Sequence, residues 1–151
     1  MWLVTLFVEN TEVSVTLKVN FCLEANNIYN VQNFRAKANG QTDSSNASLS
    51  AWGAACDSTS VATIYMPCGS YLIRNAYFDG QTCKSKDITI QIDGILLDPS
   101  DYNVIGNAES WIKFEKVTGV SIYDGTFYGQ GAGLWACKTS GKNCPKGTTV
   151  C

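Results

Sequence analysis

Histidine is absent from this 151-residue chain. A Ser-His-Asp triad, a Cys-His catalytic pair and a histidine-ligated metal are therefore excluded within these residues. Charged residues make up only 16% of the sequence, the net charge is −2, and Lys and Arg form no block, which argues against nucleic acid or a membrane surface as a partner. No stretch approaches the roughly 18 consecutive apolar residues of a transmembrane helix. The sequence indicates no cofactor, no nucleic acid and no membrane partner.

The chain also lacks a Cys-x-x-Cys motif, although it has seven cysteines. The missing motif gives little support to a zinc ribbon or a thioredoxin-like protein. A cysteine density this high in a small β-rich chain favours an oxidising compartment.

Two disulfides are expected. Cys137 and Cys144 flank a polar loop and predict a local disulfide, and a second pair should come from Cys56, Cys68 and Cys83, whose partners the sequence cannot choose. Buried free thiols are the alternative. The odd count leaves at least one cysteine unpaired, and the first and last of the seven, at positions 22 and 151, are the expected ones.

Residues 1–28 are predicted to be a leader ahead of the main domain at 29–151. The first eight residues, MWLVTLFV, are apolar enough for a short signal-peptide core, but they carry no basic segment, and acidic residues follow at once. Residues 13–19 alternate apolar and polar side chains like a strand. A secretion signal, an extra strand and a disordered leader all stay open.

Residues 43–56 are predicted to form an amphipathic helix. Thr42 or Asp43 can cap its free N–H groups, and Leu49, Trp52 and Cys56 fall on one face at helical spacing. If the chain that follows forms a stack of β-coils, as the repeat described next predicts, such a helix would cover the first coil, whose end must be covered. Residues 46–48 are an N-glycosylation sequon, so Asn46 is a candidate glycosylation site.

Short apolar segments recur from residue 61 onward at a spacing of 24 residues. The aligned sets are Ile64, Ile88 and Ile112; Met66, Ile90 and Phe114; and Leu72, Leu96 and Val120. A fixed period of this size is typical of stacked repeats, here of strands, and the Asp-Gly pairs at 79–80, 93–94 and 124–125 would be corners between the strands. A small β-sandwich with coincidental spacing is the alternative.

Few residues suggest catalysis. Asp98 and Asp101 offer two carboxylates, as glycoside hydrolysis requires, but Asp-Pro-Ser-Asp is also an ordinary turn. Residues 125–133 are glycine-rich without the Gly-Lys-Ser/Thr of a phosphate loop, so tight coil turns are the expected role. Trp111 and Trp135 could stack on sugar rings, although aromatic side chains more often pack in a core.

Three segments resemble the N-terminal part of plant polygalacturonases, which are pectin-degrading glycoside hydrolases. The first has YNVQNF at 29–34, NGQTD at 39–43, and Ala-Trp and Ala-Cys at 51–52 and 55–56. The second has PCGSYL at 67–72 and GQTCKS at 80–85, and the third, the most specific, has VSIYDGT at 120–126, GQG at 129–131 and Trp135. Arg35, where the family has Gly, is one of several departures, all of which lie in turns.

The resemblance implies an all-β fold, a right-handed parallel β-helix of the pectin-lyase-like type with a capping helix. It also implies a secreted, monomeric protein of the extracellular space or cell wall that hydrolyses α-1,4-galacturonosyl bonds of pectin. The family's catalytic motifs, Asn-Thr-Asp, Gly-Asp-Asp, Gly-His-Gly and Arg-Ile-Lys, are absent from this sequence, so no catalytic or substrate-binding residue can be assigned.

The resulting expectation is a truncated, inactive and poorly soluble fragment. A non-catalytic wall-binding module is the second hypothesis, with only Lys84, Lys86, Lys113 and Lys116 as candidates. A pectin lyase would need calcium-binding Asp clusters and an Arg base that are equally absent, and the segment 125–135 favours the hydrolase.

Overall fold

The computed structural model describes residues 8–9, 12–13, 27–108 and 110–146. In the leader, β1 (Val8–Glu9) pairs with β2 (Glu12–Val13) in antiparallel fashion. The predicted signal core and most of the predicted strand at 13–19 lie outside the described residues, as do the cysteines at 22 and 151. The boundary at residue 28 stays a prediction.

The described part of the main domain is built from strands, with two α-helices between them and a third after the last strand. The strands are β3 (Ile28–Asn30), β4 (Asn39–Asp43), β5 (Ala62–Met66), β6 (Ser70–Leu72), β7 (Ala76–Asp79), β8 (Ile88–Leu97), β9 (Ile112–Glu115) and β10 (Val120–Tyr128). The helices are α2 (Ser45–Asp57), α3 (Tyr102–Ile105) and α4 (Ala132–Thr139), and a 3-10 turn, η2 (Val31–Phe34), follows β3. No helix within these ranges is long and apolar enough to cross a membrane.

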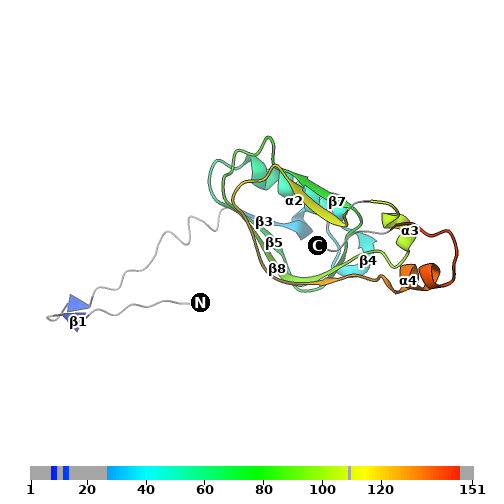
Figure 1. The fold of residues 1–151 in the computed structure, drawn as a ribbon. Coiled ribbons are helices and arrows are strands. Elements are labelled where there is room, and N and C mark those ends of the chain that lie inside the picture. The colour runs from blue at the N-terminus through cyan, green and yellow to red at the C-terminus, as the bar shows by residue number, and fades with distance from the viewer. Residues whose placement is uncertain (1–7, 10–11, 14–26, 109, 147–151) are drawn as a thin grey trace.

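Every strand pair of this domain is parallel, and strands from successive turns of the chain lie side by side. One wall runs β3, β5, the first half of β8 and the first half of β10. The next wall runs β4, β6 and the second halves of β8 and β10, and the third pairs β7 with β9. Figure 1 shows the walls curling around one interior. The predicted fold, a parallel β-helix, is therefore confirmed, and the right-handed sense is the one that parallel crossovers usually take.

The predicted 24-residue register is wrong. Ile64 pairs with Ile90, and Ile90 pairs with Ile122, so the first wall repeats after 26 and then 32 residues. Ile112 lies on the third wall, opposite Ala76, 36 residues earlier. The reason is that loops of different length separate the strands: the third coil carries α3 between β8 and β9. Alternating apolar strands match one another at several offsets, so the sequence alone cannot select the true one.

Two of the predicted Asp-Gly corners lie inside long strands and bend them from the first wall to the second. In β8 the bend is at Asp93-Gly94, and in β10 the register shifts between Asp124 and Thr126. Asp124 and Gly125 both have positive φ, 59° and 87°. The third pair, at 79–80, ends β7, where the Gly80 N–H donates to the Glu115 carbonyl at 2.9 Å.

The predicted helix is α2, which begins two residues later than expected. Asp43 binds one of the free N–H groups at the start of the helix, as predicted, because its Oδ1 accepts from the Ser45 N–H at 2.9 Å. Trp52 and Cys56 are buried and Leu49 is partly buried against the core, as the spacing predicts. In the first coil α2 comes after the strand of the second wall, in the place that β7 and β9 take in later coils. The helix therefore covers the interior where the third wall has no strand of the first coil.

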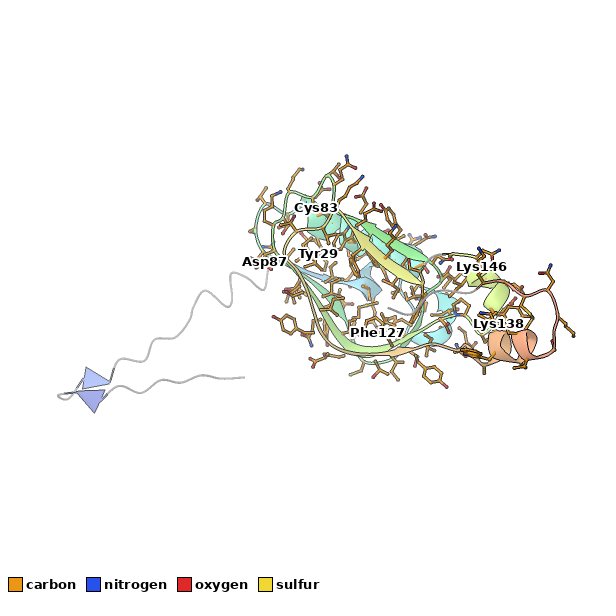
Figure 2. All side chains as sticks on the ribbon, viewed as in Figure 1. Tyr29, Cys83, Asp87, Phe127, Lys138 and Lys146 are labelled. Atoms are coloured by element: carbon orange, nitrogen blue, oxygen red, sulfur yellow. A yellow bond between two sulfur atoms is a disulfide. The ribbon has the colours of Figure 1, made fainter. Side chains whose placement is uncertain are left out.

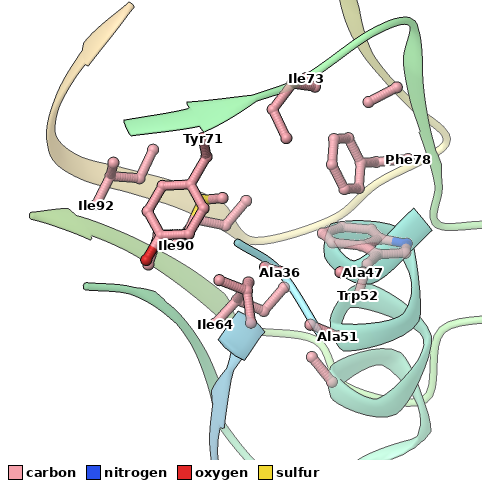
Figure 3. Close-up of a cluster of buried hydrophobic side chains, with 14 of the residues drawn as sticks. Ala36, Ala47, Ala51, Trp52, Ile64, Tyr71, Ile73, Phe78, Ile90 and Ile92 are labelled. Carbon is pink, nitrogen blue, oxygen red and sulfur yellow. The ribbon is translucent and has the colours of Figure 1, made fainter. Parts of the chain in front are cut away.

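The interior of the coils is apolar and closely packed. Figure 3 shows the α2 face opposite aliphatic side chains of β5 and β8. Trp52 lies edge-on to Phe78 with ring centroids 5.4 Å apart, and its Nε1–H donates to the Asp79 carbonyl at 2.9 Å. Phe78 stacks on Phe114 of the next coil at 4.7 Å. These contacts fix α2 to the third wall.

Candidate functional site

The two candidate carboxylates are both engaged in holding the backbone. The Asp98 carboxylate accepts the Gln130 N–H, while the Gln130 side-chain amide donates to the Asp98 carbonyl at 2.6 Å. Burial raises the pKa of Asp98, and the hydrogen bond from Gln130 partly opposes that shift. Asp101 accepts from the N–H and the side-chain amide of Asn103, each at 2.9 Å, and so caps α3. The turn interpretation of this segment is confirmed for Asp101.

The glycine-rich segment 125–133 serves close packing. A Cβ on Gly125 would lie 2.8 Å from Ile92 Cβ, and one on Gly133 would lie 3.2 Å from the Tyr102 ring. Larger residues would push β10 away from β8 and α4 away from α3. The predicted tight turn is confirmed for Gly125, at the bend of β10, whereas Gly133 lies inside α4 and its role is close packing against α3.

The two candidate tryptophans differ in environment. Trp111 is half-buried, donates to the Ile73 carbonyl at 2.7 Å and lies edge-on to Phe127, so it is a packing residue. Trp135 is 70% exposed on α4, with the Lys138 ammonium 5.9 Å from its ring centroid. Of these two tryptophans, Trp135 is the one that presents an exposed ring.

The lysines proposed for a binding surface mostly contact neighbouring side chains. Lys84 is 3.2 Å from Asp57, Lys113 is 3.4 Å from Glu115, and Lys116 donates to Gln81 at 2.8 Å. These contacts account for three of the four candidates as ordinary surface pairs. Lys86 is exposed.

Both predicted disulfides form. Cys56 is bonded to Cys83, and Cys137 to Cys144, while Cys68 is a free, exposed thiol within the described residues. Asn46 is exposed in the first turn of α2, so its glycosylation stays a prediction. Three or more His, Cys, Asp or Glu side chains gather as metal ligands nowhere in the described ranges.

Sequence reasoning missed a polar row on the outer face of the first wall. The Tyr65 hydroxyl donates to Asp93 at 2.7 Å, and the Gln91 amide bridges Asp93 and Asp124 at 3.0 and 2.8 Å. Hydrogen bonds from Gln91 and Tyr65 lower the pKa of Asp93, and the bond to Asp93 raises that of Tyr65. The only sequence signal is the alternation that turns these residues outward. The row links three coils, and its two carboxylates accept hydrogen bonds from side chains of the row itself.

A second feature lies at the C-terminal end of the described chain. From Gly125 to Lys146 the sequence has three lysines, Lys138, Lys142 and Lys146, and no acidic residue. Figure 2 shows Lys138 and Lys146 at the end of the molecule that holds α4. The sequence signal for this feature is a segment whose charged residues are all lysines, although the net charge of the whole chain is −2.

Comparison with known proteins gives one consistent family. A polygalacturonase of Prunus persica is 48% identical over 133 residues, which are 87% of this chain and 34% of that protein. A polygalacturonase of Medicago sativa is 34% identical over 87% of this chain, and an exopolygalacturonase of Zea mays 36% identical over 72%. No family model matches.

Among solved structures, an exopolygalacturonase of Yersinia enterocolitica aligns over 63% of this chain and 19% of its own, with 19% identity and a TM-score of 0.47. The chain spans about a third of the length of the first plant relatives, 34% and 32%. The predicted resemblance is confirmed: by sequence, this chain belongs to the plant polygalacturonase family.

Proposed function

We propose that the chain is part of a polygalacturonase that hydrolyses α-1,4-galacturonosyl bonds of pectin, and that its coils are the scaffold of that enzyme. The 48% identity to the peach polygalacturonase over 87% of the chain carries the proposal. The described fold supports it, because each parallel coil presents a wall on which a further coil can stack.

We further propose that these 151 residues do not hydrolyse pectin alone. An inverting glycosidase needs two free carboxyl groups roughly 6.5–9.5 Å apart across the scissile bond. The candidates Asp98 and Asp101 instead accept backbone N–H groups. The two carboxylates of the polar row, Asp93 and Asp124, accept hydrogen bonds from Tyr65 and Gln91. Each of the four therefore has a local structural role in the fold.

A chimera tests the scaffold role. This chain replaces the segment that it matches in the peach polygalacturonase, and reducing-end release from polygalacturonate is measured. The chimera should hydrolyse the polymer, and the 151-residue protein alone should not. A matched control chimera carries Gly94→Val, which blocks the corner of β8, and should lose activity with its fold.

Two outcomes contradict the proposal. A folded, disulfide-bonded chimera without hydrolysis would refute the scaffold role. Reducing-end release by the pure 151-residue protein would refute its predicted inactivity.

Secretion to the extracellular space or cell wall is part of this proposal, with a monomeric state. The two disulfides support an oxidising compartment, and exposed Asn46 gives an acceptor for a glycan. Expression in plant cells should give an endoglycosidase-sensitive product in the medium, with the sensitivity lost in Asn46→Gln. Retention of an unglycosylated, reduced protein in the cytosol would contradict secretion.

A non-catalytic wall-binding protein is the alternative. The lysines first considered for it are mostly paired with neighbours, so they give it no support. The exposed Trp135 beside Lys138 is the observation that favours a binding role.

A further inference from the structure

The segment that carries α4 is fastened to the coils at several separate points. Gln130, just before the helix, is held by Asp98 through two hydrogen bonds. Gly133 packs directly against the Tyr102 ring of α3, and the Lys146 N–H donates to Asn107 Oδ1 at 2.9 Å. The backbone that carries the exposed side chains is thereby held in place before any ligand arrives, which lowers the entropy that binding must overcome.

Crosslinks within the segment fix its own shape. The disulfide between Cys137 and Cys144 joins the end of α4 to the following loop, with Cα atoms 6.1 Å apart. The Lys138 ammonium donates to the Lys146 carbonyl at 2.8 Å, which holds the two lysines close to each other. Figure 2 shows both at the same end of the molecule. Lys142 lies in the loop that the disulfide closes.

The exposed chemistry of this segment is an aromatic ring beside positive charge. Trp135 precedes Lys138 by three residues, so both lie on one face of α4, and Trp135 is 70% exposed. We name the surface of Trp135, Lys138, Lys142 and Lys146 the α4 platform. Asp98 and Asp101, the acidic groups on the elements that pack against it, accept backbone hydrogen bonds, and within the described residues neither is paired with a lysine of the platform.

We propose that the α4 platform binds a polyuronate, a chain of pyranose rings that each carry a carboxylate. The C–H face of a pyranose ring packs on an exposed indole, while ammonium groups attract the carboxylates. Neither a neutral glycan nor a simple polyanion matches both features. The choice of uronate over other acidic sugars rests on the proposed function, but the platform itself does not.

Calorimetric titration of the disulfide-bonded protein with an unesterified oligogalacturonate tests the proposal. Trp135→Ala and Lys138→Gln should each weaken binding about fivefold, the size of an exposed aromatic–cation or charge contact. Lys86→Gln is the matched control, because Lys86 is an exposed lysine of another loop, and it should bind like the parent protein. The fully methyl-esterified oligomer, which has lost its charges, should bind at least as weakly as the variants do.

The indole N–H signals in a nitrogen–proton NMR spectrum locate the site independently of those variants. The signal that disappears in Trp135→Phe should be the one that shifts with ligand. Equal binding of the esterified oligomer, equal loss in Lys86→Gln, or an unmoved Trp135 signal would each overturn the proposal. Polyphosphate binding that is as tight as oligogalacturonate binding, and that Trp135→Ala does not weaken, would also overturn it, because it would indicate a general polyanion surface.

The titration measures no hydrolysis, so the two proposals fail separately. An active chimera with an unresponsive platform removes only this inference. An inactive chimera whose platform binds oligogalacturonate removes only the proposed enzymatic role.

Discussion

The corner at Gly94 is a point where a single methyl group should damage the stack through lack of space alone. A Cβ at this position would lie 2.6 Å from the Gly69 carbonyl oxygen and 2.7 Å from that of Pro67. Both oxygens belong to the corner of the preceding coil, between β5 and β6. The φ of Gly94 lies outside the left-handed region, so space rather than backbone conformation requires glycine here.

The cost follows from how far the neighbours must move. Ordinary carbon contacts begin at 3.4 Å, so Gly94→Ala needs a separation of about 0.7–0.8 Å more from two backbone carbonyls. Overpacking of this kind costs about 2–3 kcal/mol. For a chain of this size that lowers the melting temperature by about 5–10 °C.

Gly53→Ala is the matched control. Gly53 lies inside α2, where an added Cβ meets nothing within 4 Å. Replacing glycine in a helix interior stabilises it by about 1 kcal/mol, which should raise the melting temperature by about 2–4 °C.

Thermal unfolding followed by circular dichroism compares the two variants with the parent protein under identical conditions. The same substitution should therefore act in opposite directions at the two sites. If Gly94→Ala melts at or above the parent temperature while Gly53→Ala shows its expected rise, the close approach of the two corners is refuted.

Three other predictions follow from the contacts between coils. Replacing the Cys56–Cys83 disulfide by two alanines should cost about 3.5 kcal/mol in denaturant unfolding, because it frees a loop of 27 residues; an unchanged midpoint would contradict this. The Glu115 carboxylate raises the pKa of Tyr77 to about 12, so the phenol's contribution to stability is complete below its unfolded pKa near 10 and disappears as the pH rises through about 12. Ultraviolet titration of Glu115→Gln should show that pKa falling, and a phenol still near 12 would refute the contact. Ile90→Lys should lower the denaturant midpoint strongly, because it buries an unpaired charge at a position that is 6% exposed, whereas Ile122→Lys, 44% exposed at the equivalent position of β10, should lower it little; equal losses would refute the difference in burial.

The strands, corners and capping helix were predictable because each depends on a pattern within a few residues. Alternation of apolar side chains predicted β5 and β8, Asp-Gly predicted the bends, and the spacing of Trp52 and Cys56 predicted the buried face of α2. The register was not predictable. Ile64 can align with Ile88 or Ile90 equally well in an alternating strand, and loop lengths elsewhere decide between them.

The candidate site shows the same division. The sequence offered Asp98 as a carboxylate close to another, but its partner, Gln130, is 32 residues away and on another coil. The pairing of Cys56 with Cys83 rather than Cys68 likewise depends on which loop the coil brings to the end of α2. Local patterns show which residues face outward, and only the stacking shows which of them are already engaged.

Burial along one interior row explains why damage at a corner should be felt by the whole stack. Ile64, Ile90 and Ile122 occupy equivalent positions on three successive coils, and their exposed fractions are 3%, 6% and 44%. The side chain is the same in each case, so the difference comes from whether coils lie on both sides or on one. In such a solenoid most stability resides in the contacts between neighbouring coils. A methyl group at Gly94 separates two coils, and every interior row that crosses the boundary loses contacts with it. The same reasoning explains why β10 has an apolar side chain at Ile122 although it is exposed: its position in the repeat is an interior one.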